Sequence, residues 1–178
     1  MRILFLGDSL IEFCDWRSRF PKHDVCNAGL AGETVAGLLA GLPQIMRRCP
    51  EPAMIFLMIG TNNLVMEDYG FISDYENILK SLKNLSPFAK VICTGMLPIQ
   101  LPWLAADAIS RVNDSLRRLV QANGAIFLDL CEPFTENGHP RSSCFEEDGV
   151  HLSPVGYAVW ASAMAALIDK STEGSPNG

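Results

Sequence analysis

Ser9, Asn62, Asp148 and His151 are residues whose types suit chemistry on a carbonyl group. Ser9 and Asn62 each follow a short apolar segment, and Asp148 and His151 stand three residues apart, so that one turn can bring their side chains together. A serine hydroxyl becomes a nucleophile when a base lies beside it, and amide N–H groups stabilise the oxyanion that its attack creates. Brought into one site, these residues could carry out acyl transfer.

Each of these residues also has an ordinary structural interpretation. A serine after a strand often caps a helix, and a histidine in a loop can bind a nearby carbonyl group. Turns commonly contain asparagine and glycine, which is the simpler interpretation of Asn62 and of Gly29 taken singly. The choice depends on whether the fold brings these residues together.

Short apolar segments indicate a parallel sheet. Four of them are nearly continuous, as expected of strands that are covered on both faces, and a weaker one follows the first. The five expected strands are Arg2–Leu6, His23–Asn27, Ala53–Ile59, Lys90–Thr94 and Ala125–Leu128.

Helical patterns occupy the intervals between these strands. Apolar residues recur at helical spacing over 35–46, 75–85 and 109–120, and a final helix is expected from Ser153-Pro154 to about Asp169. Regular alternation of strand and helix predicts an α/β fold, a three-layer α/β/α sandwich around a five-stranded parallel sheet with a flavodoxin-like shape. We expect a single domain over residues 1–170 and a flexible tail over 171–178.

Ligands of open parallel sheets bind beyond the carboxyl ends of the strands. Ser9, Gly29 and Asn62 each follow one of the expected strands, and a long loop after the fifth strand leads to Asp148 and His151. All the residues that could do chemistry therefore fall on one edge of the predicted sheet.

Four segments at this edge resemble the sequence blocks of the GDSL, or SGNH, hydrolases. They are Gly7-Asp8-Ser9-Leu10, Gly29, Gly60-Thr61-Asn62-Asn63 and Asp148-Gly149-Val150-His151. The segments occur in the family's order and span most of the chain. The departure is Asn63, where the family usually has aspartate, at a position outside its catalytic triad. The resemblance implies a small, single-domain esterase, lipase or acylhydrolase that needs no cofactor or metal.

Family membership would assign a role to each residue. Ser9 would be the nucleophile, His151 the general base and Asp148 the carboxylate that orients the imidazole. The backbone amides of Ser9 and Gly29 and the side-chain amide of Asn62 would form the oxyanion hole.

Charge and hydropathy exclude several other classes of protein. The 178 residues include 14 basic and 20 acidic ones, with no basic run, which argues against a nucleic-acid partner. The apolar runs are shorter than the roughly 18 residues that a membrane-spanning helix needs, so we expect no integral membrane association. The apolar start of the chain is interrupted by Gly7-Asp8-Ser9, which is unlike a secretory signal.

Cysteine spacing bears on the cellular compartment. Six cysteines are scattered along the chain without a CxxC pair, so we expect six reduced thiols and a cytoplasmic protein.

Two rival interpretations remain for the fold and the polar residues. A non-catalytic, flavodoxin-like module that binds a small molecule would share the alternating pattern, but GxxxxGK[ST] and GxGxxG are both absent. A zinc site built from Cys131, His139, Cys144 and His151 would have an unfamiliar ligand spacing.

The substrate is the least determined feature. The small size of the chain favours a shallow site and short-chain esters, with a lysophospholipase or an acyl-thioesterase of longer chains as the alternative. The apolar segment Met96–Leu104 could line an acyl pocket, form a homodimer contact or pack under the last helix. Ile11 and Phe13, just after Ser9, are expected in the core, with the wall of a pocket as the alternative.

Overall fold

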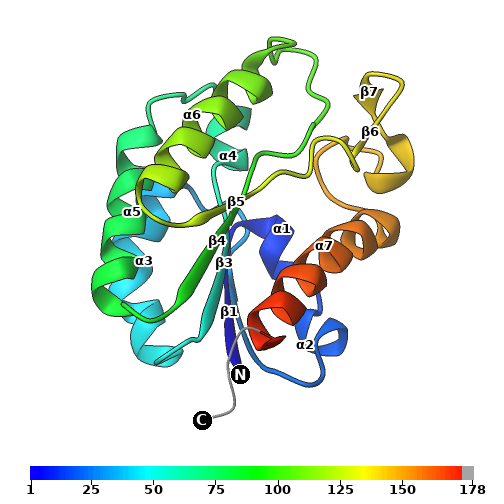
Figure 1. Cartoon of the computed structure of the whole chain (residues 1–178). Coiled ribbons are helices and arrows are strands. Elements are labelled where there is room, and N and C mark those ends of the chain that lie inside the picture. The colour runs from blue at the N-terminus through cyan, green and yellow to red at the C-terminus, as the bar shows by residue number, and fades with distance from the viewer. Residues whose placement is uncertain (174–178) are drawn as a thin grey trace.

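The computed structural model describes residues 1–173, and a parallel sheet of five strands forms its centre (Figure 1). The strands are β1 (Arg2–Gly7), β2 (Asp24–Gly29), β3 (Met54–Met58), β4 (Lys90–Thr94) and β5 (Ile126–Leu128). They lie in the order β2-β1-β3-β4-β5, and every neighbouring pair is parallel. The predicted five-stranded parallel sheet is confirmed.

Helices cover both faces of this sheet, which gives the predicted three-layer α/β/α sandwich (Figure 1). One face carries α3 (Val35–Arg48), α5 (Ile72–Leu85) and α6 (Ala108–Ala122), and the other carries α1 (Ser9–Glu12), α2 (Trp16–Arg19) and α7 (Pro154–Glu173). The short α4 (Thr61–Val65) follows β3.

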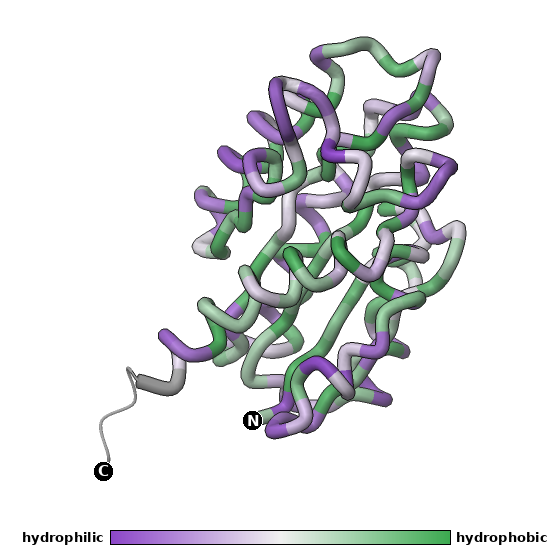
Figure 2. Tube along the Cα trace, turned by 90° about the vertical axis from the view of Figure 1, so that its right-hand side faces the viewer, coloured by the Kyte–Doolittle hydropathy of each residue, from purple (hydrophilic) through white to green (hydrophobic). Residues whose placement is uncertain are grey.

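Alternating side chains of the strands supply both cores. Ile3 and Phe5 of β1 pack in the cluster that contains α7, whereas Leu4 and Leu6 pack in the cluster that contains α3 and α5. In Figure 2, green, hydrophobic segments run through the middle of the molecule, and many of the purple, hydrophilic segments lie toward its periphery. A strand that is buried on both faces has to be apolar throughout, which explains the continuous runs in the sequence.

Several short elements were not predicted from the sequence. The helices α2 and α4 are not among the expected helices. A two-stranded hairpin of β6 (Thr135–Glu136) and β7 (His139–Pro140) and a 3₁₀ turn over Ser142–Cys144 occur in the segment expected to be a long loop. The expected tail is also wrong at its start, because α7 continues to Glu173. The remainder of that tail, 174–178, lies outside the described residues.

The apolar segment after β4 packs under the last helix. Leu97 and Ile99 are buried in the same cluster as Trp160 and Met164 of α7. Trp103, farther along this segment, is about half exposed and donates its indole N–H to the Val65 carbonyl at 3.4 Å. Of the three alternatives for this segment, packing under the helix accounts for its first residues.

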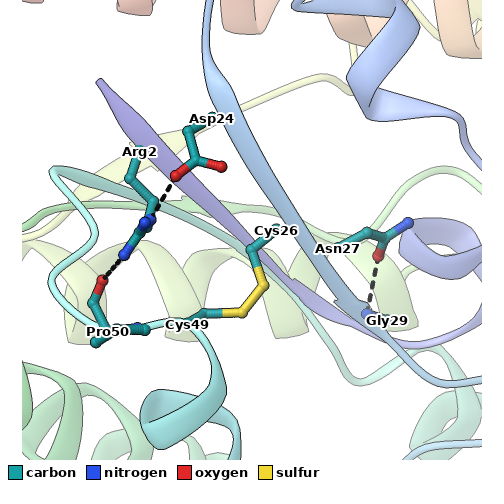
Figure 3. Close-up of a disulfide and its surroundings, with 7 residues drawn as sticks. All are labelled: Arg2, Asp24, Cys26, Asn27, Gly29, Cys49 and Pro50. Carbon is teal, nitrogen blue, oxygen red and sulfur yellow. Dashed lines mark hydrogen bonds and ion pairs between the residues drawn. A yellow bond between two sulfur atoms is a disulfide. The ribbon is translucent and has the colours of Figure 1, made fainter.

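Cys26 of β2 and Cys49, which follows α3, form a disulfide (Figure 3). Their Cα atoms lie 6.3 Å apart, within the span that a disulfide bridges. The expectation of six reduced thiols is therefore wrong for this pair, because the return of α3 to the sheet brings together residues that are 23 positions apart. The expected cytoplasmic location loses that support. In residues 1–173, none of the helices has the length and apolar character needed to cross a membrane.

Candidate active site

Ser9 stands at the carboxyl edge of the sheet, as the first residue of α1 directly after β1. The cap of this helix is Asp8, whose Oδ1 accepts the Leu10 amide at 3.0 Å, so the interpretation of Ser9 as the capping residue is wrong. The Ser9 hydroxyl is free to interact elsewhere, and its Oγ lies 3.0 Å from Nε2 of His151.

Asp148 completes a chain of three side chains. Its Oδ2 lies 2.5 Å from Nδ1 of His151, while the opposite ring nitrogen faces Ser9. The carboxylate is thus placed to hold Nδ1 protonated, which leaves Nε2 as the acceptor toward the Ser9 hydroxyl. The structure brings together Ser9, His151 and Asp148, although 142 positions separate Ser9 from His151.

The turn that carries Asp148 and His151 is held by its own backbone. Oδ1 of Asp148 accepts the amides of Val150 and His151, both at 2.9 Å. Gly149 between them has a φ of +70° and its carbonyl accepts the Gln100 amide at 2.9 Å. Because a φ in this range strains any residue with a side chain, glycine suits this position.

Electrostatics differ sharply between the two aspartates of the site. Partial burial raises the pKa of Asp148, but hydrogen bonds from the His151 ring and from two backbone amides outweigh it and hold this pKa at about 2. Burial raises the pKa of Asp8 to about 6, although the Leu10 amide opposes the shift. Asp148 is therefore ionised even in mildly acidic solution, whereas Asp8 gives up its proton only as the pH rises to about 6.

The expected oxyanion donors are only partly in place. Asn62 donates Nδ2 to the Glu33 carbonyl at 2.8 Å, which orients the amide and uses one of its two N–H bonds. The Gly29 amide, however, donates to Oδ1 of Asn27 at 3.0 Å (Figure 3). The expectation of a free Gly29 amide is wrong, because the side chain two residues earlier already accepts its hydrogen.

Gly32, rather than Gly29, has a backbone amide that is available to an oxyanion. Among residues 1–173, the backbone amides of Ser9 and Gly32 make no hydrogen bond. Gly32 has a φ of +78° and precedes Glu33, the residue whose carbonyl holds Asn62. A glycine two positions before the helix cap Thr34 was the signal available in the sequence, although it does not reveal which amide is free.

The other two histidines lie away from this site. His23 precedes β2, at the opposite end of the strands from Ser9, and His139 lies in β7. No group of three or more His, Cys, Asp or Glu side chains suited to a metal ion occurs within the described part of the chain.

Comparison with known proteins agrees with the geometry. The sequence profile of the GDSL-like lipase/acylhydrolase family matches residues 5–159. The chain belongs to this family. It is accordingly a hydrolase of ester bonds.

Relatives of this GDSL-like hydrolase include the platelet-activating factor acetylhydrolase IB subunit alpha1 of Rattus norvegicus. The two are 27% identical over 172 residues, which cover 93% of this chain and 74% of the relative. A lipase/acylhydrolase from Enterococcus faecalis has the same fold, with a TM-score of 0.78, 18% identity and 96% coverage of both chains. A GDSL-like lipase from Bacteroides thetaiotaomicron has a TM-score of 0.75 at 22% identity, with 96% of this chain and 88% of that chain covered.

Asn63, the departure from the family's usual aspartate, has a structural environment. It is buried, its Oδ1 accepts the Val35 amide at the start of α3, and its Nδ2 donates to Asp68 at 2.7 Å. An aspartate here would place a second carboxylate against Asp68, which an asparagine avoids. Asp68 therefore provides a hydrogen-bond partner for the asparagine at position 63. The hydrogen bonds of Asn63 involve neither Ser9 nor His151.

A cleft of about 550 Å³ opens beside His151 in this GDSL-like hydrolase. Its lining includes His151, Phe13, Arg19 and, from α7 and the turn before it, Leu152, Pro154 and Tyr157. The Phe13 ring lies 5.5 Å from the His151 ring, and its side chain is 59% exposed, whereas Ile11 is fully buried. Core burial was thus predicted correctly for Ile11 and wrongly for Phe13, which forms a wall of the cleft.

Proposed function

We propose that this hydrolase is a serine esterase that cleaves short-chain carboxylic esters through an acyl-enzyme intermediate, with Ser9, His151 and Asp148 as its catalytic triad. The observation that carries the proposal is the unbroken chain from Ser9 Oγ to His151 Nε2 at 3.0 Å and from His151 Nδ1 to Asp148 Oδ2 at 2.5 Å.

The first half of the reaction acylates Ser9. Its hydroxyl gives a proton to Nε2 of His151 while Oγ attacks the carbonyl carbon of the ester. Asp148, ionised at neutral pH, stabilises the imidazolium that forms. His151 then gives that proton to the departing alkoxide, so that an alcohol leaves and the acyl group stays on Ser9.

The second half releases the acid. Water enters, loses a proton to His151 and attacks the acyl-enzyme, and the same proton returns to Ser9 when the carboxylic acid departs. No cofactor is needed, because each step only moves a proton and exchanges an acyl bond.

Three N–H groups support the oxyanion of both tetrahedral intermediates in this proposal. They are the Ser9 amide, the Gly32 amide and the second hydrogen of the Asn62 side chain, with Gly32 in place of Gly29. Hydrogen-bond availability supports this set, because the Ser9 and Gly32 amides have no acceptor in residues 1–173 and the Glu33 carbonyl holds Asn62. Donors already fixed in place contribute most to stabilising developing charge.

Short acyl groups are supported by the name of the rat relative, an acetylhydrolase subunit that is 27% identical to this chain. Esters of longer acyl chains, as in lysophospholipids or acyl thioesters, are the alternative within the same mechanism.

A fluorophosphonate probe and a series of p-nitrophenyl esters test the proposal. We expect one covalent adduct by mass spectrometry, its absence in Ser9→Ala, and the highest kcat/KM for acetyl or butyryl esters. A protein that forms no adduct and hydrolyses none of the esters would instead be a binding module. Highest activity on chains of ten carbons or more would replace the short-chain assignment by the long-chain alternative.

A further inference from the structure

The cleft beside His151 takes no part in the proton transfers of the proposed reaction. It runs between the segment after α1 and the start of α7, and its lining includes His151 but none of the proposed oxyanion donors. An ester bound at Ser9 has an acyl half and an alcohol half, which extend in different directions from the reacting carbonyl group. One of these halves can enter the cleft.

The path of the proton determines whether the acyl half or the alcohol half of the ester faces the cleft. The alkoxide that leaves must receive its proton from Nε2 of His151, so the leaving oxygen has to lie next to the imidazole. The carbonyl oxygen has to point toward the free amides at Ser9 and Gly32. The group attached to the leaving oxygen is therefore the one that continues past His151 into the cleft.

Walls of the cleft favour a flat apolar group. Phe13 presents its ring to solvent at the mouth, and the rings or chains of Leu152, Pro154 and Tyr157 lie along the lining. A large exposed aromatic side chain beside a catalytic imidazole is unusual for a residue that only stabilises the fold. A ring placed between Phe13 and the opposite wall would meet it in a stacked or edge-on arrangement.

Charges in the cleft favour an uncharged ligand. Arg19 contributes one positive charge, and Asp15 and Glu146 contribute negative ones. An anionic or a cationic group would meet charges of both signs, whereas a neutral ring gains contact area without losing hydration of a charge.

We propose that this cleft binds the alcohol half of the substrate and selects a neutral aromatic alcohol, with Phe13 as the residue that determines this specificity. The inference rests on the esterase function proposed above and adds the class of alcohol to it.

Benzyl acetate and methyl phenylacetate test the assignment, because these isomers carry the same ring on opposite sides of the ester. We expect Phe13→Ala to lower kcat/KM for benzyl acetate about 3- to 10-fold more than for methyl phenylacetate. Phe88→Ala is the matched control, since Phe88 is 99% exposed and lies outside the lining of the cleft, and we expect it to leave the ratio unchanged. An equal effect of Phe13→Ala on both isomers, or a greater one on methyl phenylacetate, would overturn the proposal.

A binding measurement separates failure of this inference from failure of the esterase function. Benzyl alcohol added to the Ser9→Ala protein should shift the ring resonances of His151 in NMR spectra, and the Ser9→Ala/Phe13→Ala protein should bind it at least 3-fold more weakly. This readout needs no turnover. Absence of the shift would overturn the alcohol site even in an active esterase, whereas a shift in a protein without esterase activity would support the cleft and reject only the reaction.

Discussion

Oδ1 of Asp8 accepts the Leu10 amide at 3.0 Å, while Oδ2 of the same carboxyl group is buried and has no hydrogen-bond partner among residues 1–173. The group is fully buried beside the nucleophile, and burial raises its pKa to about 6. One oxygen caps a helix and the other loses its hydration, so the native protein binds this proton more tightly than the unfolded chain does.

Asp8 should therefore make stability fall as the pH rises from about 4 to above 6. Its contribution is fully present below the unfolded pKa near 4 and is lost as the pH passes the native value, a difference of about 3 kcal/mol. Asp8→Asn keeps an oxygen for the Leu10 amide and has no such titration. We expect this variant to match the wild type near pH 4 and to exceed its free energy of unfolding at pH 7.5.

Urea unfolding of both proteins from pH 3.5 to 8 measures this difference. Asp148 titrates with a lowered pKa near 2, so its stabilisation is lost only as the pH falls below about 4 and does not overlap with that of Asp8. A variant that retains the wild-type slope between pH 4 and 6 would show that another group is responsible.

Asp148→Asn should lower kcat by about 10²–10⁴-fold with little change in fold. The asparagine oxygen can still accept the amides that shape the turn, but an amide cannot stabilise the imidazolium of His151 or hold the required tautomer. Glu147→Gln is the matched control, because this neighbouring acidic residue is exposed. Steady-state kinetics on p-nitrophenyl acetate measure kcat of each variant, and circular dichroism checks its fold. Similar losses of kcat in both variants would show that the negative charge of the loop as a whole, rather than the Asp148 carboxylate, supports catalysis.

Asn62 and Asn63 are adjacent but should respond differently to alanine. Asn62→Ala removes a proposed oxyanion donor, and a loss of about 10²–10³-fold in kcat is expected. Asn63→Ala leaves the buried Val35 amide without its acceptor, so it should mainly lower the free energy of unfolding, by about 1–3 kcal/mol. Kinetics and urea unfolding of both variants separate the two roles, and an Asn62→Ala enzyme with full activity would exclude that side chain from the oxyanion hole.

The sheet could be predicted from the sequence because it follows from regular patterns. The same patterns placed Ser9 and His151 at one edge of the sheet, and the resemblance to the GDSL blocks paired them. Strands buried on both faces leave continuous apolar runs, and parallel strands bring their carboxyl ends to one edge. The sequence patterns could not predict that the Gly32 amide, rather than the Gly29 amide, is available to an oxyanion. Gly29 ends β2 and Gly32 follows three residues later, and only the position of the Asn27 side chain in three dimensions shows that the Gly29 amide is already bonded.

Phe13 and the Cys26–Cys49 pair show the same limit. An apolar residue after a helix is most simply assigned to the core, and nothing in the local pattern shows that the ring faces His151. Cys26 and Cys49 meet because of where α3 ends relative to β2. Both features depend on the packing of elements that are distant in sequence, which periodicity does not describe.

Thiol titration tests the disulfide directly. The protein denatured without reductant should show four free thiols, Cys14, Cys93, Cys131 and Cys144, and six after reduction. Closing a loop of this length is worth about 3 kcal/mol in the chain-entropy account, so reductant should lower the unfolding midpoint of the wild type and not that of Cys26→Ser/Cys49→Ser. Six thiols in the unreduced protein would show that the pair is not oxidised.

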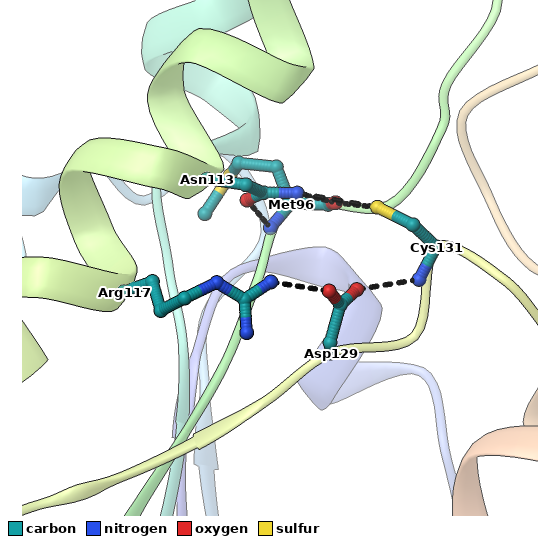
Figure 4. A network of polar contacts seen from close by, with 5 residues as sticks. All are labelled: Met96, Asn113, Arg117, Asp129 and Cys131. Atoms are coloured by element: carbon teal, nitrogen blue, oxygen red, sulfur yellow. Dashed lines mark hydrogen bonds and ion pairs between the residues drawn. The ribbon is translucent and has the colours of Figure 1, made fainter. Parts of the chain in front are cut away.

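The side-chain amide of Asn113 in α6 makes two hydrogen bonds to the backbone of Met96, just after β4 (Figure 4). Oδ1 accepts the Met96 amide at 2.7 Å, and Nδ2 donates to the Met96 carbonyl at 2.9 Å. This contact is buried and lies just before Leu97, where the chain passes under α7. The nearby ion pair of Arg117 with Asp129 is partly exposed, and the guanidinium also lies over the Phe127 ring.

Asn113→Leu should therefore destabilise the protein far more than Arg117→Gln. The leucine leaves the Met96 N–H without its acceptor and the Met96 carbonyl with only the weak Cys131 Sγ–H donor at 3.9 Å. This loss costs about 2–4 kcal/mol, whereas a partly exposed ion pair contributes about 1 kcal/mol or less. Chemical denaturation of the two variants gives the comparison, and added salt should reduce only the Arg117 contribution. Equal losses would mean that water replaces the Asn113 amide at Met96, in which case the passage of the chain under α7 depends on apolar packing alone.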